Sequence, residues 1–161
     1  VITTASRPEA GNRKTPGKVI SYDLENGNVI WECSGLTDNA IPCPIVENGV
    51  AYCMTGYQGF SLLAVPISGR GDQSQNMIWK GNSGTPYVPS AVLYDGLLYF
   101  TQSNQAILSC VDAQTGKTQT SYKTAKGSSF VDIFPSVFAW APDGKSLAIG
   151  MEDFDLEFWK P

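Results

Sequence analysis

The stretch Asp23-Leu24-Glu25-Asn26-Gly27-Asn28-Val29-Ile30-Trp31 has a counterpart later in the chain, Asp112-Ala113-Gln114-Thr115-Gly116-Lys117-Thr118-Gln119-Thr120. The two stretches begin 89 residues apart, at positions 23 and 112, and both have a glycine four positions after the aspartate. An aspartate carboxylate can accept hydrogen bonds from backbone amides two residues on, and glycine can adopt the left-handed conformation that closes a turn. The repeat therefore predicts a strand, a turn and a second strand at both places.

A second repeat lies between these two stretches. The segments Ile41-Pro42-Cys43-Pro44-Ile45-Val46-Glu47-Asn48-Gly49-Val50-Ala51-Tyr52 and Val88-Pro89-Ser90-Ala91-Val92-Leu93-Tyr94-Asp95-Gly96-Leu97-Leu98-Tyr99 align without a gap, 47 residues apart at Pro42 and Pro89. Short strands that recur about every 45 residues are typical of β-propeller blades of four strands each. The sequence thus predicts an all-β chain built of four-stranded antiparallel blades.

β-Branched and aromatic runs bounded by Gly, Asn, Asp and Pro predict thirteen strands and no helix. The predicted order is an irregular N-terminal segment over residues 1–17 and a partial propeller over 18–161. The propeller divides into a half blade at 18–33, a blade at 41–80, a blade at 88–123 and a partial blade at 136–161. With about three to four blades against the usual ~4 to 8 of closed rings, an incomplete or open propeller is expected.

Two tryptophans occupy matching places on the outgoing strands of successive repeats, Trp31 and Trp79. An indole at this position can wedge between neighbouring blades while its N–H donates to a carbonyl, which is a structural role. The third repeat has Thr120 at the tryptophan position. In the second repeat, Pro66 and the loop 68–75 replace the aspartate turn. Looser docking is expected at both departures.

Composition argues against several classes of function. The chain of 161 residues contains no histidine, so it lacks the usual general base of serine and cysteine hydrolases and the commonest transition-metal ligand. Its formal charge of −4 argues against nucleic acid as a partner, because such binding needs clustered Lys and Arg. No apolar run reaches the ~18 residues of a membrane helix. No residue set predicts a catalytic or metal site, and the chain is expected to be non-enzymatic.

Four cysteines lie at positions 33, 43, 53 and 110. The equal steps between Cys33, Cys43 and Cys53 predict that they lie on successive strands. This spacing is compatible with buried free thiols and with one cross-strand disulfide. A zinc site is disfavoured because the chain has neither a histidine nor two cysteines close together in sequence. The sequence leaves the disulfide state open.

The pattern Asp-x-x-x-Gly-x-x-x-Trp and the run Asp112-Ala113-Gln114-Thr115-Gly116-Lys117 resemble the tryptophan-docking repeats of the quinoprotein-like, or PQQ-like, β-propeller family, over about Lys18 to Lys123. The family includes quinoprotein dehydrogenases and non-enzymatic scaffolds, such as the propeller lipoprotein of the outer-membrane barrel-assembly machinery. The stretches Trp31-Glu32-Cys33-Ser34-Gly35-Leu36 and Tyr52-Cys53-Met54-Thr55-Gly56-Tyr57 look most similar to large secreted bacterial members. The run Phe138 to Gly150 instead resembles a WD-repeat blade.

The resemblance implies a periplasmic or secreted bacterial protein, with a cytoplasmic WD-repeat scaffold as the alternative. Quinoprotein enzymes hold their quinone with calcium, a stacking tryptophan and, in alcohol dehydrogenases, a disulfide between adjacent cysteines. This chain has no adjacent cysteines, so no cofactor is assigned to it. The expected function is a scaffold that binds a protein, a small ligand or further blades. The alternative is a fragment of a PQQ- and calcium-dependent oxidoreductase whose cofactor residues lie elsewhere.

Two short motifs are better explained by structure or by chance than by ligand binding. Asp153, Asp155 and Glu157 alternate with apolar residues, which predicts a strand with one acidic face more readily than a cation site. Arg70-Gly71-Asp72 is an adhesion-like string, and its occurrence by chance in a glycine-rich loop is the preferred explanation.

Overall fold

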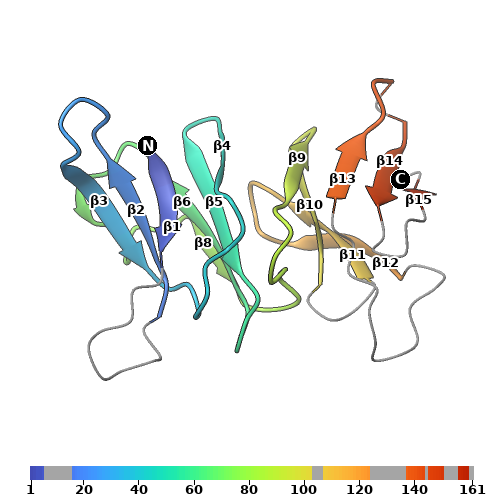
Figure 1. Cartoon of the computed structure of the whole chain (residues 1–161), viewed down its shortest axis with the longest axis horizontal. Helices are drawn as coiled ribbons and strands as arrows, with labels where there is room; N and C mark the ends of the chain where they lie inside the picture. The colour runs from blue at the N-terminus through green and yellow to red at the C-terminus, as the bar shows by residue number, and fades with distance from the viewer. Residues whose placement is uncertain (6–15, 103–106, 124–136, 144, 151–155, 160–161) are drawn as a thin grey trace.

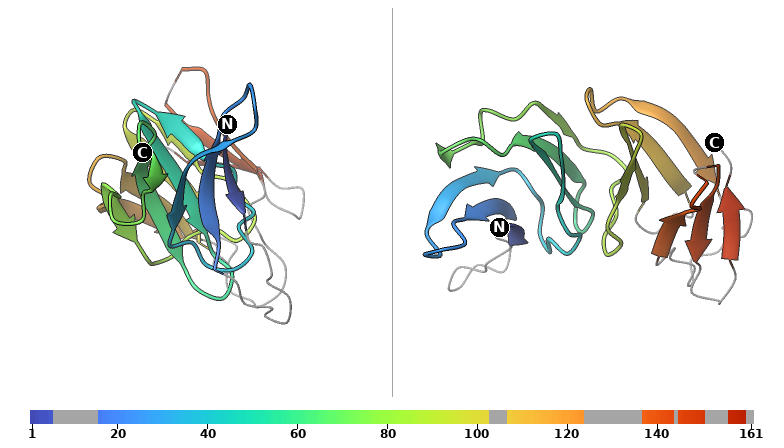
Figure 2. Two further views of the ribbon diagram at one scale, coloured as in Figure 1. Left: turned by 90° about the vertical axis from the view of Figure 1, so that its left-hand side faces the viewer. Right: turned by 90° about the horizontal axis from the view of Figure 1, so that it is seen from above.

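The computed structural model describes residues 1–5, 16–102, 107–123, 137–143, 145–150 and 156–159. These residues form strands and turns without a helix. The strands make four sheets that follow one another along an arc, which does not close into a ring (Figures 1 and 2). The expectation of an all-β, open arrangement is confirmed.

The first three sheets have four strands each, and the fourth has three. The first sheet has the order β1 (Ile2–Ala5), β2 (Lys18–Tyr22), β3 (Val29–Ser34), β7 (Gly71–Asp72). The second has the order β4 (Ile45–Glu47), β5 (Val50–Thr55), β6 (Ser61–Pro66), β8 (Trp79–Gly81). The third is β9 (Val92–Tyr94), β10 (Leu97–Thr101), β11 (Ile107–Asp112), β12 (Thr118–Lys123). The fourth is β13 (Val137–Trp140), β14 (Leu147–Gly150), β15 (Leu156–Trp159).

The second sheet lies between the first and the third, and its sequence reflects this position. Nearly every residue of β5 and β6 is buried, whereas buried and half-buried residues alternate along β2. A strand covered on both faces needs a continuous apolar run, and a strand covered on one face needs alternation. Two apolar clusters result, one on each face of the second sheet.

Two hairpin turns have the backbone that their sequences predict. Asn48 and Gly49 have φ values of 49° and 80°, and Asp95 and Gly96 have φ values of 49° and 73°. Two successive positive φ values match the twist of the strands that such a turn joins. These turns fix the register of β4 on β5 and of β9 on β10.

Two strands were not expected from the sequence. The N-terminal segment, predicted to be irregular over residues 1–17, contains β1, which pairs antiparallel with β2 in the register Thr3↔Ile20. The loop 68–75 contains β7, which pairs in parallel with β3 of the first sheet and not with its own second sheet. The predicted half blade at 18–33 is therefore part of a four-stranded sheet, and residues of the predicted blade at 41–80 contribute to it.

Candidate functional site: the tryptophan joints and an exposed tyrosine pair

The first joint is the packing between the first and second sheets, and Trp31 lies within it. Trp31 is 0% exposed, and its Nε1–H donates to the carbonyl of Ile67 at 3.1 Å. The cluster around it is made of small and aliphatic side chains from β2, β3, β5 and β6 and from Leu36, which follows β3: Val19, Cys33, Leu36, Ala51, Cys53, Leu63 and Val65. The indole thus joins two sheets through an apolar contact and one directed hydrogen bond.

The loop that replaces the aspartate turn covers this joint. Gln73 donates its backbone N–H to the carbonyl of Glu32 at 2.7 Å, and Ser34 donates its N–H to the Ser74 hydroxyl at 2.9 Å. Together with β7, these bonds attach the loop to the outer strand β3. The expectation of looser docking here is wrong, because the longer loop has enough residues to form an additional strand.

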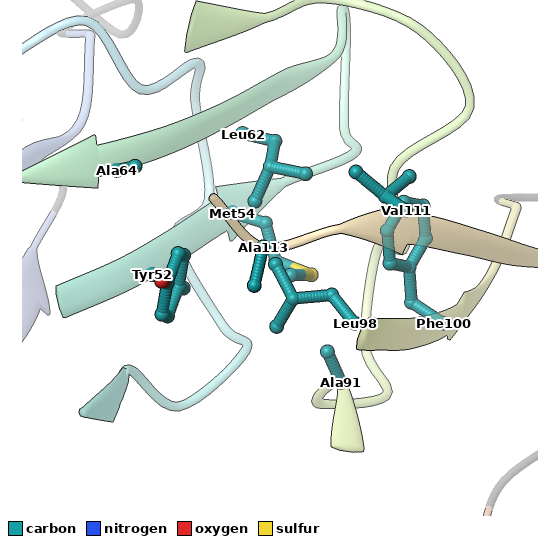
Figure 3. Packing of buried hydrophobic residues seen from close by; sticks show 9 residues of the cluster. All are labelled: Tyr52, Met54, Leu62, Ala64, Ala91, Leu98, Phe100, Val111 and Ala113. Carbon is teal, nitrogen blue, oxygen red and sulfur yellow. The ribbon is translucent and has the colours of Figure 1, made fainter. Parts of the chain in front are cut away.

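The second joint is the packing between the second and third sheets, and Trp79 lies at its edge. Trp79 is half-buried, and its Nε1–H donates to the carbonyl of Ala113 at 3.0 Å. A Cβ at Gly116 would meet the indole atoms Cδ2 and Cε3 at 2.7 Å, so only glycine fits beneath the ring. Large side chains fill the rest of this joint (Figure 3): Tyr52, Met54, Leu62, Leu98, Phe100 and Val111.

The two aspartate turns have the same backbone. The Asp23 carbonyl accepts from the Gly27 N–H at 3.0 Å, and the Asp112 carbonyl accepts from the Gly116 N–H at 2.8 Å. Gly27 and Gly116 have φ values of 72° and 71°. The carboxylate of Asp23 accepts from the backbone N–H of Glu25 at 2.8 Å, and that of Asp112 accepts from the backbone N–H of Thr115 at 2.7 Å. The hydrogen bonds from Thr115 lower the pKa of Asp112.

All four cysteines are free thiols, three of them buried and Cys43 exposed. Burial raises the pKa of Cys33 to about 11 and that of Cys53 to about 12. Burial also raises the pKa of Cys110. A thiol with a raised pKa holds its proton at neutral pH and is a poor nucleophile. Cys43 lies in the connection between β3 and β4 and not on a strand, which corrects the placement expected from the ten-residue spacing.

The structure describes the Arg70-Gly71-Asp72 motif fully and the acidic alternation in part. In Arg70-Gly71-Asp72, the Asp72 carboxylate accepts from the Ser74 hydroxyl and from the Ser74 backbone N–H at 2.9 Å, and these bonds lower its pKa. The aspartate is thus engaged within its own loop. Asp153 and Asp155 of the acidic alternation lie outside the described residues, and Glu157 belongs to β15.

The described residues do not fit a calcium-bound quinone. Among them, no three His, Cys, Asp or Glu side chains lie where they could hold a metal ion. The indoles of Trp31 and Trp79 pack within the joints and donate to backbone carbonyls. The part of the chain described above also contains no helix long and apolar enough to cross a membrane.

A pair of tyrosines that the sequence did not single out, one exposed and one half-buried, lies at one end of the second sheet. Tyr57 follows β5, and Tyr87 lies between β8 and β9; their rings stack with centroids 4.9 Å apart and an interplanar angle of 28°. Tyr57 is 37% exposed and Tyr87 is half-buried. Phe60, three residues after Tyr57, is 38% exposed, and Val88, next to Tyr87, is 54% exposed. We call Tyr57 and Tyr87 the tyrosine pair.

Three threonines hold the backbone beneath the tyrosine pair. Thr85 is 0% exposed, donates its hydroxyl to the carbonyl of Thr55 and accepts the Ser61 N–H at 3.2 Å. The Thr37 hydroxyl lies 2.8 Å from that of Thr55 and 3.1 Å from the carbonyl of Tyr57. A Cβ at Gly56 would meet the Thr85 carbonyl oxygen at 2.3 Å, so the two segments touch directly. No local sequence signal marks this site, because Tyr57 and Tyr87 come from separate connections of the fold.

No protein-family model and no curated protein matches this chain. Solved structures do. BamB from Moraxella catarrhalis matches 99% of this chain and 49% of its own, with 16% identity and a TM-score of 0.58. The quinohemoprotein alcohol dehydrogenase ADHIIG from Pseudomonas putida HK5 matches 86% of this chain and 26% of its own, with 15% identity and a TM-score of 0.60.

The fold is an open β-propeller. Both neighbours have PQQ-like propeller folds, so the resemblance deduced from the repeats is supported at the level of the fold. The chain spans about half the length of the BamB structure and about a quarter of the dehydrogenase. The sheets can accordingly be called blades, first to fourth in chain order. One of the two neighbours is an alcohol dehydrogenase and the other is BamB, and the similarity to both shows the fold alone.

Proposed function

We propose that this chain is a non-catalytic interaction module of a bacterial, extracytoplasmic protein with PQQ-like repeats, and that it binds a protein or small ligand through the loops at the blade ends. The tyrosine pair carries this proposal. Aromatic rings supply large contact area at a low cost in side-chain entropy, and tyrosine is enriched at binding surfaces. Fold similarity to BamB supports a propeller module, on which the proposed interaction role builds.

The threonine network makes this surface suitable for binding. Thr37, Thr55 and Thr85 fix the two segments that present Tyr57 and Tyr87, and the two rings stack on each other. A surface that is ordered before binding loses less conformational entropy when a partner arrives. A partner with a flat or extended apolar segment would therefore contact the pair without reorganising the loops.

The experiment is a selection of peptides from a displayed random library on the intact chain, followed by affinity measurement by calorimetry. The double variant Tyr57→Ser/Tyr87→Ser should raise the Kd of the selected peptides by about tenfold or more, as expected when aromatic anchors are removed. The matched control is Tyr94→Ser, because Tyr94 is 41% exposed on β9 and lies outside the pair. Equal losses in the two variants would contradict the proposal.

The second candidate is a fragment of a PQQ-dependent oxidoreductase whose cofactor residues lie elsewhere, which the fold similarity to a quinohemoprotein alcohol dehydrogenase favours. Its test is reduction of a redox dye by the full-length protein with added PQQ, calcium and a primary alcohol. Dye reduction that requires both additions would support the enzyme and count against the interaction module. A protein that selects peptides through the tyrosine pair and reduces no dye would support the module.

A further inference from the structure

The turn 56–60 and the connection 82–88 meet at one end of the second blade, and together they carry the tyrosine pair. β6 pairs with β8 in the register Leu62↔Gly81, so the residues before Leu62 and those after Gly81 lie at the same end of the sheet. The Ser61 N–H donates to the Thr85 hydroxyl at 3.2 Å and joins the two segments. We call residues 56–60 and 82–88 the end surface.

The end surface carries no charged side chain. Asp, Glu, Lys and Arg make up 16% of the chain, yet none of them occurs in residues 48–69 or 81–94. The charged residues at its border are Asp38, which follows Thr37 of the threonine network, and Lys80 on β8, and their charges are opposite. A charged ligand would lose hydration here without gaining a matching charge. The end surface therefore favours a ligand without net charge.

Uncharged hydrogen-bonding side chains stand beside the aromatic rings. Gln58, Asn82 and Ser83 are exposed. None of the three side chains hydrogen-bonds to another residue that the structure describes, unlike the Asn26 amide, whose Oδ1 accepts the Asn28 N–H at 2.9 Å. Carboxamide and hydroxyl groups both donate and accept. They are available to a ligand whose own groups do the same.

The apolar groups of the end surface are flat and open to solvent. Tyr57 is 37% exposed, Phe60 38% and Val88 54%, and Tyr57 stacks on Tyr87. The surface consists of connections at the ends of strands and does not run along the edge of a sheet. It offers no row of backbone groups with which an extended peptide could pair. Recognition here depends on ring faces and on uncharged polar side chains.

A pyranose sugar has the complementary chemistry. Its C–H bonds make an apolar face that packs on an aromatic ring, and its hydroxyls donate and accept around the rim. We propose that the end surface binds a chain of uncharged sugars, with their C–H faces on the rings of Tyr57 and Phe60 and their hydroxyls bonded to the side chains of Gln58 and Asn82. This inference rests on the proposed function and names the class of its ligand.

An open surface needs more than one sugar unit. Side chains on such a surface contact one side of a ligand, whereas a cavity that holds a single small molecule encloses most of its surface. Tyr57 with Phe60 and Tyr87 with Val88 come from different connections, so a chain of several sugars can contact both groups. A hexasaccharide should therefore bind more tightly than its monosaccharide, by about tenfold or more.

The experiment screens the intact chain on an array of immobilised neutral and anionic glycans. The strongest neutral hexasaccharide is then titrated in solution by calorimetry, with its monosaccharide alongside, and its site is mapped by NMR of backbone amides. The amide resonances of Gly56, Gly59 and Gly84 should shift, and that of Gly116 in the third blade should not. Tyr57→Ser/Tyr87→Ser should raise the Kd of the hexasaccharide by about tenfold or more.

Single amide variants keep the test independent of the tyrosines. Gln58→Ala and Asn82→Ala should each raise the Kd of the hexasaccharide by about threefold to tenfold, because each removes hydrogen bonds to the ligand. The matched control is Gln114→Ala, since Gln114 is an exposed amide on the turn of the third blade and should leave the Kd unchanged. Far-ultraviolet circular dichroism verifies that every variant is folded.

Three results would overturn the sugar ligand: no neutral glycan is bound, an anionic glycan is bound as tightly, or the tyrosine and amide variants bind like the wild-type chain. The two proposals fail separately. Selected peptides that need the tyrosine pair, with no glycan bound, would support the interaction module and reject the sugar. A chain whose tyrosine pair contributes to binding neither peptides nor glycans would reject both.

Discussion

The first and second joints make the same hydrogen bond with different surroundings. In each, an indole N–H reaches a carbonyl of the next blade, at 3.1 Å from Trp31 and at 3.0 Å from Trp79. Trp31 is completely buried beneath the loop that contributes β7, whereas Trp79 is half-buried on Gly116. Aliphatic side chains and two thiols fill the first joint, whereas the second joint also contains the aromatic side chains of Tyr52 and Phe100. One docking geometry is therefore compatible with two kinds of packing.

The largest difference between the joints should appear when each tryptophan is removed. Trp31→Ala should lower the free energy of unfolding by about 3–5 kcal/mol, the range for a fully buried tryptophan. Trp79→Ala should cost less, about 2 kcal/mol, because the ring is already partly in water. Urea unfolding followed by far-ultraviolet circular dichroism measures both without relying on tryptophan emission.

The phenylalanine variants separate packing from hydrogen bonding. Trp31→Phe and Trp79→Phe keep most of the apolar contact and lose the indole N–H, so each should cost about 1 kcal/mol beyond its change in volume. If Trp79→Ala proved as costly as Trp31→Ala, burial of the indole would not be what distinguishes the joints.

The thiols of the first joint should be strongly protected from reaction with thiol reagents. Raising the pKa from 9.0 to about 11 at Cys33 lowers the thiolate fraction at pH 8 by about a hundredfold, and the shift to about 12 at Cys53 lowers it by about a thousandfold. An aromatic disulfide reagent should react quickly with exposed Cys43 and slowly with the other three. Cys43→Ser is the control and should remove the fast phase.

The same shifts predict how alkali affects stability. Above about pH 9 the thiols of the unfolded chain ionise, while Cys33 and Cys53 keep their protons in the folded chain until about pH 11 and 12. The contribution of these two thiols to the free energy of unfolding is thus fully present below pH 9 and declines above it. Fast modification of more than one thiol in the native chain would contradict this description of the first joint.

The glycine beneath Trp79 should be sensitive to substitution for two reasons. Gly116→Ala introduces strain at a φ of 71° and a contact of 2.7 Å with the indole, whereas Gly27→Ala introduces only the strain at a φ of 72°. We expect losses of about 2–3 kcal/mol and about 1 kcal/mol, respectively. In a Trp79→Ala background the cost of Gly116→Ala should fall to that of Gly27→Ala, because only the strain remains.

The sequence predicted the parts of the fold that depend on local residues. Strands β5 and β12 lie within the blades predicted at 41–80 and 88–123, and the Asn48-Gly49 and Asp95-Gly96 turns have the two positive φ values that such dipeptides favour. β1 and β7 were missed because each is short and is stabilised by pairing with a strand distant in sequence. The tyrosine pair was missed for the same reason, since Tyr57 and Tyr87 meet only after the second blade has folded. The energetic role assigned to the tryptophans stays a prediction.

The loop that contains β7 should contribute a smaller amount to the free energy of unfolding through the first joint. Ser74→Ala removes the hydroxyl that accepts the Ser34 N–H at 2.9 Å and that donates to Asp72. One partly exposed hydrogen bond of this kind contributes about 1 kcal/mol. Exposed Ser68 lies in the same loop, so Ser68→Ala is the matched control and should change stability little. Equal effects of the two substitutions would show that the loop covers Trp31 without being fastened by Ser74.

The smallest expected effect is on stability in acid. It can be measured at one aspartate in the loop of the first joint and at one in the turn of the second. The pKa values of Asp72 and Asp112 are lowered chiefly by hydrogen bonds from Ser74 and Thr115. A lowered pKa in the folded chain stabilises it above the unfolded value of about 4, and this stabilisation is lost as pH falls through the folded value. Asp72→Asn and Asp112→Asn should each flatten the decline of the unfolding free energy between about pH 4 and pH 2, with Glu25→Gln as the control for removing a charge. Because both carboxylates are exposed, solvent limits the change to a fraction of what burial would give. A decline that neither substitution alters would mean that the hydrogen bonds of the two aspartates survive protonation.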